Sequence, residues 1–428
     1  MIIEKPNIIY LHSHDTGRYI QPYGYPVQTP NLQAFAESGT VFRDAHCANP
    51  TCSPARACLL TGQYAHQNGM YGLAHLGWSL KDYKKHILHT LHDHGYVSAL
   101  GGFQHIAAGE KPHATIGYQR KLDCDSSAHG VADAAINYFN EKHEKPFFLS
   151  LGTFETHRPF PEPLKKHNPK YKRPPATFPD TKETRHDYAA YCTMAEVMDE
   201  AYGRIFDALI QTSLADNTIV ICTTDHGIAF PKMKCNLTSH GTGVLLIMKG
   251  PGIQPGQVND ALISQVDIFP TICDCIGIKH PNWLEGQSFK PVIDGQKDQI
   301  QDSVFASVNV HVSKEVSRMA RTKELLYIRR YGSRNTVALP NCDSGLTKNV
   351  LMRSGWQDKY MDREYLFDLI HDPMETCNVA TQSDYQDKLQ HMRGRLEAWQ
   401  IRTSDPLLHG DIPIHGQAII KDPNEIEP

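Results

Sequence analysis

Short apolar segments alternate with stretches of helical periodicity over the first two thirds of the chain. The apolar runs of strand length are Asn7–Leu11, Val97–Leu100, Pro146–Leu151 and Thr218–Thr223. The stretches of helical character are Pro30–Gly39, Lys84–Gly95, Val131–Lys142 and Asp187–Thr212. This alternation predicts an α/β fold, with a large, mostly parallel sheet that carries helices on both faces. In such sheets, ligands bind beyond the carboxyl ends of the strands.

The pattern changes near residue 290, where residues 286–295 are typical of a linker. Beyond it, the predicted strands of a smaller antiparallel sheet are Ser303–Val310, Glu324–Arg330 and Tyr365–Leu369. A closing helix is predicted over Asp384–Thr403. We therefore predict a large first domain, residues 1–290, and a smaller C-terminal α+β domain, residues 291–428. The segment Pro159–Thr184, rich in Pro, Lys and His, is predicted to be a long surface loop of the kind that is often functional.

Composition and charge narrow the classes of partner. Hydrophobic residues make up 40% of the 428 residues and charged residues 21%, which is typical of a soluble globular protein. The net charge of −4 gives no indication of nucleic acid or of an acidic membrane surface as a partner, and no apolar run is long enough to span a bilayer. The first predicted strand begins at Asn7, so we expect no signal peptide, a cytoplasmic location and mostly reduced cysteines.

Residues Asn49–Gly62 (NPTCSPARACLLTG) carry the most specific motif of the chain. Cys52, Pro54 and Arg56 form C-x-P-x-R. Proline suits the first turn of a helix because its φ is fixed, and the free N–H groups at a helix start can receive an anion. Arg56 can fork onto the oxygens of the same anion. We expect Cys52 to lie in a short exposed turn.

Two pairs of polar residues follow predicted strands. His14-Asp15 comes after the first strand, and Asp225-His226 comes after the strand that ends at Thr223. Either pair alone would also suit a turn or a helix cap. Together, at one edge of one sheet and near Cys52, they could share one cation. The candidate ligands from these pairs are His14, Asp15, Asp225 and His226.

These motifs resemble those of the type I sulfatases of the alkaline phosphatase superfamily. The resemblance rests on the Cys52 motif with its downstream Leu-Leu-Thr-Gly, on Asp225–Ile228 and Val266–Thr271, and on His66–Gly72 (HQNGMYG), which is similar to the heparan N-sulfatase (sulfamidase) branch. It covers nearly the whole chain. It implies an alkaline phosphatase-like fold and hydrolysis of an O-linked or N-linked sulfate on a carbohydrate. It leaves a homodimer open.

The resemblance also implies the catalytic apparatus. A formylglycine-generating enzyme converts the cysteine, here Cys52, to Cα-formylglycine, whose hydrate is the nucleophile, and a divalent cation, calcium in the family, polarises the sulfate. The implied metal ligands are His14, Asp15, Cys52, Asp225 and His226. Arg56 would stabilise the hydrate, and His105 would be the base that releases sulfate. His157 would be a sulfate ligand or the acid for the leaving group, and Lys234 would contact the sulfate.

The sequence departs from the family pattern at two positions. His14 stands where the family has an aspartate; calcium prefers oxygen ligands whereas imidazole suits transition metals, so zinc or manganese are alternatives to calcium. Phe103 stands where the family motif G-K-x-H has a lysine that lies beside the sulfate. Arg18 is the first candidate to supply the missing positive charge in a substrate-binding role; His66 and His311, and also His12 and His75, are weaker candidates.

Three functions stay open from the sequence. The first is a formylglycine sulfatase that acts on a carbohydrate sulfate. The second is a phosphodiesterase or phosphonate monoester hydrolase of the same superfamily, which His226 would suit. The third is a catalytically inactive binding protein that keeps the pocket, supported by the loss of the lysine and the first aspartate and opposed by the intact C-x-P-x-R.

Overall fold

The computed structural model of the chain describes residues 5–414 and 416–428. Its large sheet has eight strands in the order β4-β3-β5-β1-β6-β7-β2-β8. β7 runs antiparallel to β6 and to β2, and the other neighbouring pairs are parallel. The predicted class, a mostly parallel sheet with helices on both faces, is confirmed.

The strands of the large sheet are β1 (Asn7–Ser13), β2 (Thr40–His46), β3 (Val97–Gly102), β4 (Arg120–Lys121), β5 (Phe147–Gly152), β6 (Thr218–Thr224), β7 (Leu246–Lys249) and β8 (Gln257–Ser264). The helices of this part are α1 (Pro30–Glu37), α2 (Cys52–Thr61), α3 (Ala65–Asn68), α4 (Ile87–Asp93), α5 (Pro112–Ile116), α6 (Ala128–Phe139), α7 (Lys182–Gln211), α8 (Ser239–Thr242), α9 (Ile268–Cys275) and α10 (Lys290–Ile293).

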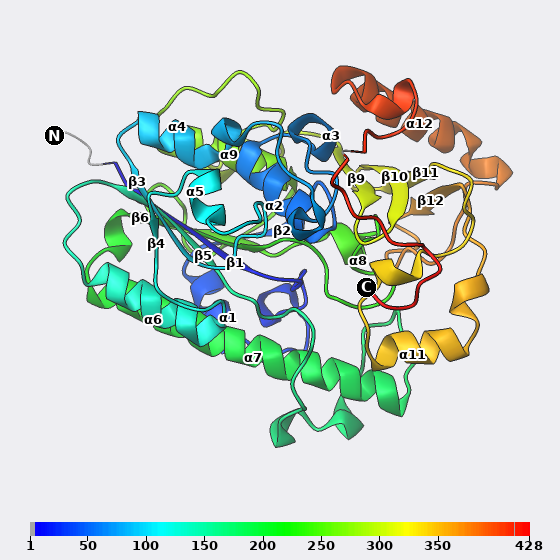
Figure 1. The fold of residues 1–428 in the computed structure, drawn as a ribbon, viewed down its shortest axis with the longest axis horizontal. Helices are drawn as coiled ribbons and strands as arrows, with labels where there is room; N and C mark the ends of the chain where they lie inside the picture. The colour runs from blue at the N-terminus through cyan, green and yellow to red at the C-terminus, as the bar shows by residue number, and fades with distance from the viewer. Residues whose placement is uncertain (1–4, 415) are drawn as a thin grey trace.

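The strand β1 lies inside the sheet and is buried on both sides. Ile8 and Tyr10 face the core shared with α2, α4, α5 and α9, whereas Ile9 and Leu11 face the core shared with α1, α6 and α7. Successive side chains of a strand point to opposite faces, so a strand buried on both faces reads as a continuous apolar run. Figure 1 shows the two helical layers on either side of the sheet.

The smaller sheet is antiparallel, in the order β12-β11-β10-β9. Its strands are β9 (Val304–Val310), β10 (Lys314–Arg321), β11 (Leu325–Arg330) and β12 (Glu364–Asp368), and its helices are α11 (Leu346–Arg353) and α12 (Gln386–Arg402). α12 packs on one face, and Leu237 and Leu262 of the larger part pack against the other. The predicted second sheet and closing helix are present, while the boundary at residues 290/291 stays a prediction. Within the described residues, none of the helices has both the length and the apolar character needed to cross a bilayer.

Two helices begin earlier than their apolar pattern predicts. The side chain of Ser127 accepts a hydrogen bond from Gly130 N–H at the start of α6, and Thr181 accepts one from Thr184 N–H at the start of α7. These capping turns are polar, so hydrophobic periodicity does not detect them. The end of the predicted loop Pro159–Thr184 therefore belongs to α7. Five strands were not predicted: β2, β4, β7, β8 and β10.

Four neighbouring parallel strands end at one edge of the large sheet. β1 ends at Ser13 and β6 at Thr224, and these two residues are paired in the sheet. On the other side of β1, β5 and β3 end together, with Gly102 paired to Gly152. The segments that follow these strands carry most of the predicted site residues, at the position where α/β sheets bind ligands.

Candidate active site

Cys52 is the first residue of α2 and is buried, with 2% of its surface exposed. The expectation of an exposed turn is therefore wrong. No side chain caps the start of α2, so its first N–H groups remain available to an anion. Arg56 lies four residues further along the helix, which places it on the same face as Cys52. Burial raises the pKa of the Cys52 thiol well above its ordinary value.

Two buried carboxylates lie beside Cys52. The Asp15 N–H donates a hydrogen bond of 2.8 Å to Asp225 Oδ1, which ties together the segments that follow β1 and β6. Asp15 has φ = +54° and His105 has φ = +61°, in the left-handed region that is unusual for residues other than glycine. Strained conformations of this kind gather at functional sites, where the surrounding structure enforces them.

The side chains of His14, Asp15, Cys52 and Asp225 each offer a ligand atom, and these atoms lie within 4.8 Å of one another. The predicted cluster is thus brought together, and His226 joins it: its Nε2 lies 3.3 Å from Asp15 Oδ1 and 3.4 Å from Cys52 Sγ. Burial lowers the pKa of His14 to about 4, so that its imidazole is neutral near pH 7 and has a lone pair for a metal.

Two buried cations face the carboxylates. Arg56 Nη2 lies 2.9 Å from Asp225 Oδ2, and another nitrogen of the same guanidinium contacts the ring of His12. Lys234 Nζ lies 2.9 Å from Asp15 Oδ2. Burial alone would lower the pKa of Lys234, but the neighbouring carboxylates outweigh it and hold this pKa above its usual value. Both cations therefore keep their charge near pH 7.

The two predicted catalytic histidines lie at different sides of the cluster. His157 Nε2 is 3.4 Å from Lys234 Nζ and 3.7 Å from Asp15 Oδ2. His105 follows β3, and its Nε2 lies 2.9 Å from Nδ1 of His75, with which its ring is stacked. Burial, with positive neighbours, lowers the pKa of His105 well below its ordinary value, so that it is a neutral imidazole able to accept a proton.

The two departures from the family pattern are in contact with each other. The rings of His14 and Phe103 have centroids 5.0 Å apart, and the Arg56 guanidinium lies 5.4 Å from the centre of the Phe103 ring. Phe103 therefore contributes a cation–π contact in place of a charge. Replacing an aspartate by histidine removes one negative charge, and replacing a lysine by phenylalanine removes one positive charge. The formal charge of the site is the same as with the family pair.

The predicted substrate-binding residues divide into two groups. His311 lies within electrostatic range of Lys234 and His226, and burial lowers its pKa to about 3. Arg18 lies elsewhere, with its Nη2 2.8 Å from the Ala45 carbonyl and 3.0 Å from the ring of His46. His66 packs against the ring of Trp399, away from the cluster. The structure thus does not place Arg18 or His66 where the lysine replaced by Phe103 would act.

Asp343 of the C-terminal part also belongs to the site, and the sequence analysis missed it. Its Oδ2 lies 3.1 Å from Lys234 Nζ. Asp343 lies in the irregular segment between β11 and α11, in no recognisable motif, so a single sequence offers no signal for it.

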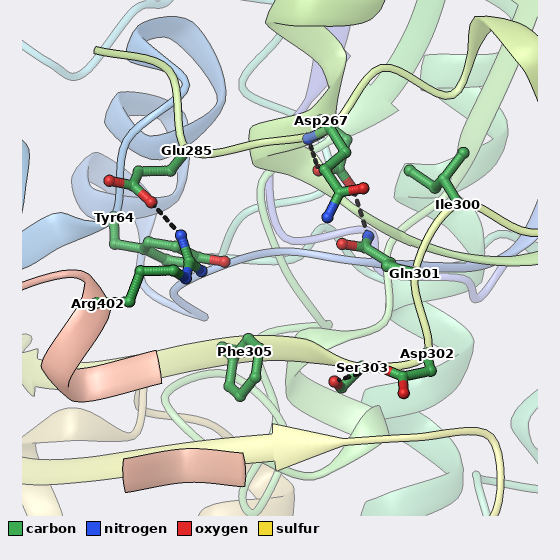
Figure 2. A pocket seen from close by; sticks show the side chains of 10 residues that line it. Tyr64, Asp267, Glu285, Ile300, Gln301, Asp302, Ser303, Phe305 and Arg402 are labelled. Atoms are coloured by element: carbon green, nitrogen blue, oxygen red, sulfur yellow. Dashed lines mark hydrogen bonds and ion pairs between the residues drawn. The ribbon is translucent and has the colours of Figure 1, made fainter. Parts of the chain in front are cut away.

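A cavity of about 550 Å³ lies apart from this cluster. Figure 2 shows its lining, which includes Tyr64, Glu285 and Arg402. Burial raises the pKa of Asp267 in this wall to about 7. The carboxylate of Asp267 accepts hydrogen bonds from the backbone N–H of Ser264 and Gln287, a structural role that joins loops of this wall.

The chain belongs to the sulfatase family, whose profile matches residues 6–278. The C-terminal domain of N-sulphoglucosamine sulphohydrolase matches residues 234–341. The human N-sulphoglucosamine sulphohydrolase is 27% identical, with 89% of this chain and 86% of the relative covered. An ulvan-active sulfatase of Formosa agariphila is also 27% identical, with 96% of this chain and 83% of the relative covered.

A solved structure with the same fold is that of a protein in complex with its substrate, D-glucosamine-2-N, 6-O-disulfate. It superposes with a TM-score of 0.71 at 19% identity and covers 94% of this chain and 99% of that chain.

Proposed function

We propose that the chain is a sulfuric ester hydrolase that removes sulfate from a carbohydrate, with a formylglycine formed from Cys52 as the nucleophile and one divalent metal. The observation that carries this proposal is the buried cluster at the ends of β1 and β6. There Cys52 lies among two carboxylates, the guanidinium of Arg56 and the ammonium of Lys234. An anion at the start of α2 would meet both cations and the free helix N–H groups.

The residues of the cluster fit a divalent cation. Among the residues that the structure describes, the side-chain cations of Arg56 and Lys234 face three carboxylates, those of Asp15, Asp225 and Asp343. The cluster thus carries one net negative charge by itself, which would repel a sulfate, and a divalent ion reverses the sign. Two carboxylates with His14 and His226 form a mixed nitrogen and oxygen ligand set, which supports zinc or manganese beside the calcium of the family. When bound, such an ion polarises the sulfate oxygens and the nucleophile as a Lewis acid.

The chain's own residues supply the rest of the chemistry. Arg56 holds the nucleophile at the start of α2, and Lys234 with His157 binds the sulfate oxygens on the opposite side. His157 is also in place to protonate the leaving oxygen or nitrogen as the bond to sulfur breaks. His105, as a neutral imidazole, takes the proton whose loss releases sulfate.

The relatives support a sulfated carbohydrate as the substrate. One curated relative is a sulphohydrolase of N-sulphoglucosamine, and another acts on ulvan. These two act on different sulfated carbohydrates, so the class of substrate that they share is a sulfated sugar. The linkage, O-sulfate or N-sulfate, is an outcome of the experiment below.

The burial of Cys52 bears on its modification. A side chain that is 2% exposed is out of reach of another enzyme in the folded chain. The formylglycine-generating enzyme that we propose as a partner would therefore act before α2 folds onto the sheet. A cytoplasmic location and a homodimer remain part of the proposal.

The alternative of a phosphodiesterase or phosphonate monoester hydrolase is favoured by one observation, the nitrogen of His226 in the metal cluster. The deciding experiment compares turnover of a panel of O-sulfated and N-sulfated oligosaccharides with that of phosphodiesters, using enzyme produced in a host that forms formylglycine. Sulfate release is the expected result. Turnover of phosphodiesters alone would refute the sulfatase, and an unmodified Cys52 with no turnover would favour the inactive binding protein.

A further inference from the structure

Asp343 is a buried acid that the proposed reaction does not use. Its side chain is 14% exposed, which leaves one edge open to a ligand, and its Oδ2 lies 3.1 Å from Lys234 Nζ. Lys234 is thereby held between two carboxylates, those of Asp343 and Asp15. An acid beside the sulfate-binding lysine weakens the attraction of an anion, so its presence calls for a separate explanation.

The segment that carries Asp343 is fixed in place. Asn341 accepts hydrogen bonds at its Oδ1 from Val312 N–H and Ser313 N–H, next to the β9–β10 turn. Lys348 Nζ donates to the Cys342 carbonyl at 2.7 Å. These bonds fix the two residues before Asp343, so its carboxylate is held beside Lys234 and its charge acts on any ligand there.

A further anchor, after Asp343 in the chain, comes from α7. Arg158, next to His157, forms two hydrogen bonds of 2.8 Å with Asp187 of α7, and the same carboxylate accepts from Thr347 N–H at the start of α11. The start of α11 is therefore docked on α7. Asp343 reaches Lys234 because of this docking.

The charge of the site suits a group with one negative charge. With a divalent ion, the cluster of Arg56, Lys234 and the three carboxylates has one net positive charge, and a sulfate monoester, which carries one negative charge, neutralises it. A phosphate monoester carries about −1.5 to −2 charges near pH 7 and would leave the site with an excess of negative charge. Removal of the carboxylate at Asp343 would shift this balance by one unit, whatever the bound ion.

We infer that Asp343 is a specificity-determining residue, which makes the site select singly charged sulfate esters and reject doubly charged phosphate monoesters of the same shape. This inference rests on the proposed function, because it concerns the group that the same pocket receives. Sulfate and phosphate monoesters have the same tetrahedral shape, so hydrogen bonds and packing alone discriminate poorly between them. A fixed negative charge does discriminate, because its repulsion grows with the charge of the ligand.

The test measures binding without turnover. In the metal-loaded Cys52→Ala protein, calorimetric titration at pH 8 gives the affinities for 4-nitrophenyl sulfate and 4-nitrophenyl phosphate. We expect the added Asp343→Asn to raise the ratio of phosphate affinity to sulfate affinity by roughly tenfold or more. A tenfold change corresponds to about 1.4 kcal/mol. Asp343→Ser, which is neutral and smaller, should raise the ratio as well. Asp343→Glu keeps the charge and should keep the ratio.

The control is Asp358→Asn, an exposed acid of the same region of the chain, which should leave both affinities unchanged. If folded Asp343→Asn and Asp343→Ser bind both ligands with the ratio of the parent, Asp343 has only a structural role and the inference is overturned. If the parent binds neither the aryl sulfate nor any member of the sulfated oligosaccharide panel, the proposed function fails and the inference fails with it. These two failures are distinguished by the parent protein alone.

Discussion

Lys234 offers the sharpest test of the site, because its ammonium is the cation that would bind the sulfate directly. In Lys234→Ala, the sulfate loses its charged partner, while Phe103 provides no replacement and Arg56 remains engaged with Asp225 at 2.9 Å. The loss of a preorganised charged donor costs on the order of 2–4 kcal/mol in the transition state. At about 1.4 kcal/mol per factor of ten, kcat/KM should fall roughly a hundredfold or more.

The same substitution should also lower stability. It leaves Asp15 and Asp343 without the cation that lies 2.9 Å and 3.1 Å from them. Removing one partner of a buried ion pair costs about 3–5 kcal/mol, and a bound divalent metal should offset part of this cost through Asp15. The melting temperature of Lys234→Ala should therefore depend on added metal more steeply than that of the parent.

The assay is steady-state kinetics on the best substrate of the oligosaccharide panel, with formylglycine content matched between variants. His157→Ala, next to Lys234, should show a loss of similar size. Lys232→Ala is the matched control, because Lys232 is exposed two residues away, and it should retain the parent's kcat/KM. Near-parent rates for both Lys234→Ala and His157→Ala would show that the sulfate does not bind between these side chains.

The remaining predictions concern the nucleophile, the metal and the paired departures. In mass spectrometry, the peptide that contains Cys52 should be about 18 Da lighter than the unmodified sequence, or should appear as the hydrate of the aldehyde. Cys52→Ala should lose nearly all turnover, and an active alanine variant would refute the formylglycine mechanism. Because a bound metal stabilises the folded state, chelation should lower the melting temperature, and zinc or manganese should restore it at least as well as calcium. His14→Asp should shift this metal preference toward calcium. An unchanged preference would show that His14 is not a metal ligand. His14→Asp combined with Phe103→Lys should keep more activity than either single variant, since only the pair conserves charge; additive losses in this double-mutant cycle would contradict the compensation.

The sequence by itself determined most of the candidate active site. The C-x-P-x-R motif, the two polar pairs after β1 and β6, His157 and Lys234 all stand in local motifs, and the structure brings them together around Cys52. This is predictable because the carboxyl ends of parallel strands meet at one edge of a sheet, so residues that follow buried apolar runs are neighbours in space. β1 and β6 were predictable for the same reason, as buried strands have continuous apolar patterns.

Other features depended on the tertiary structure. Arg18 is three residues from Asp15, but the chain turns away there and Arg18 binds the Ala45 carbonyl instead. The burial of Cys52, the contact between His14 and Phe103, and the approach of Asp343 to Lys234 come from packing between segments far apart in the chain. Motifs record which side chains a local segment offers, whereas the charge balance of a pocket depends on every segment that packs against it. Asp343 reaches the site only because its segment is held by the β9–β10 turn and by α7, and no local pattern encodes that docking.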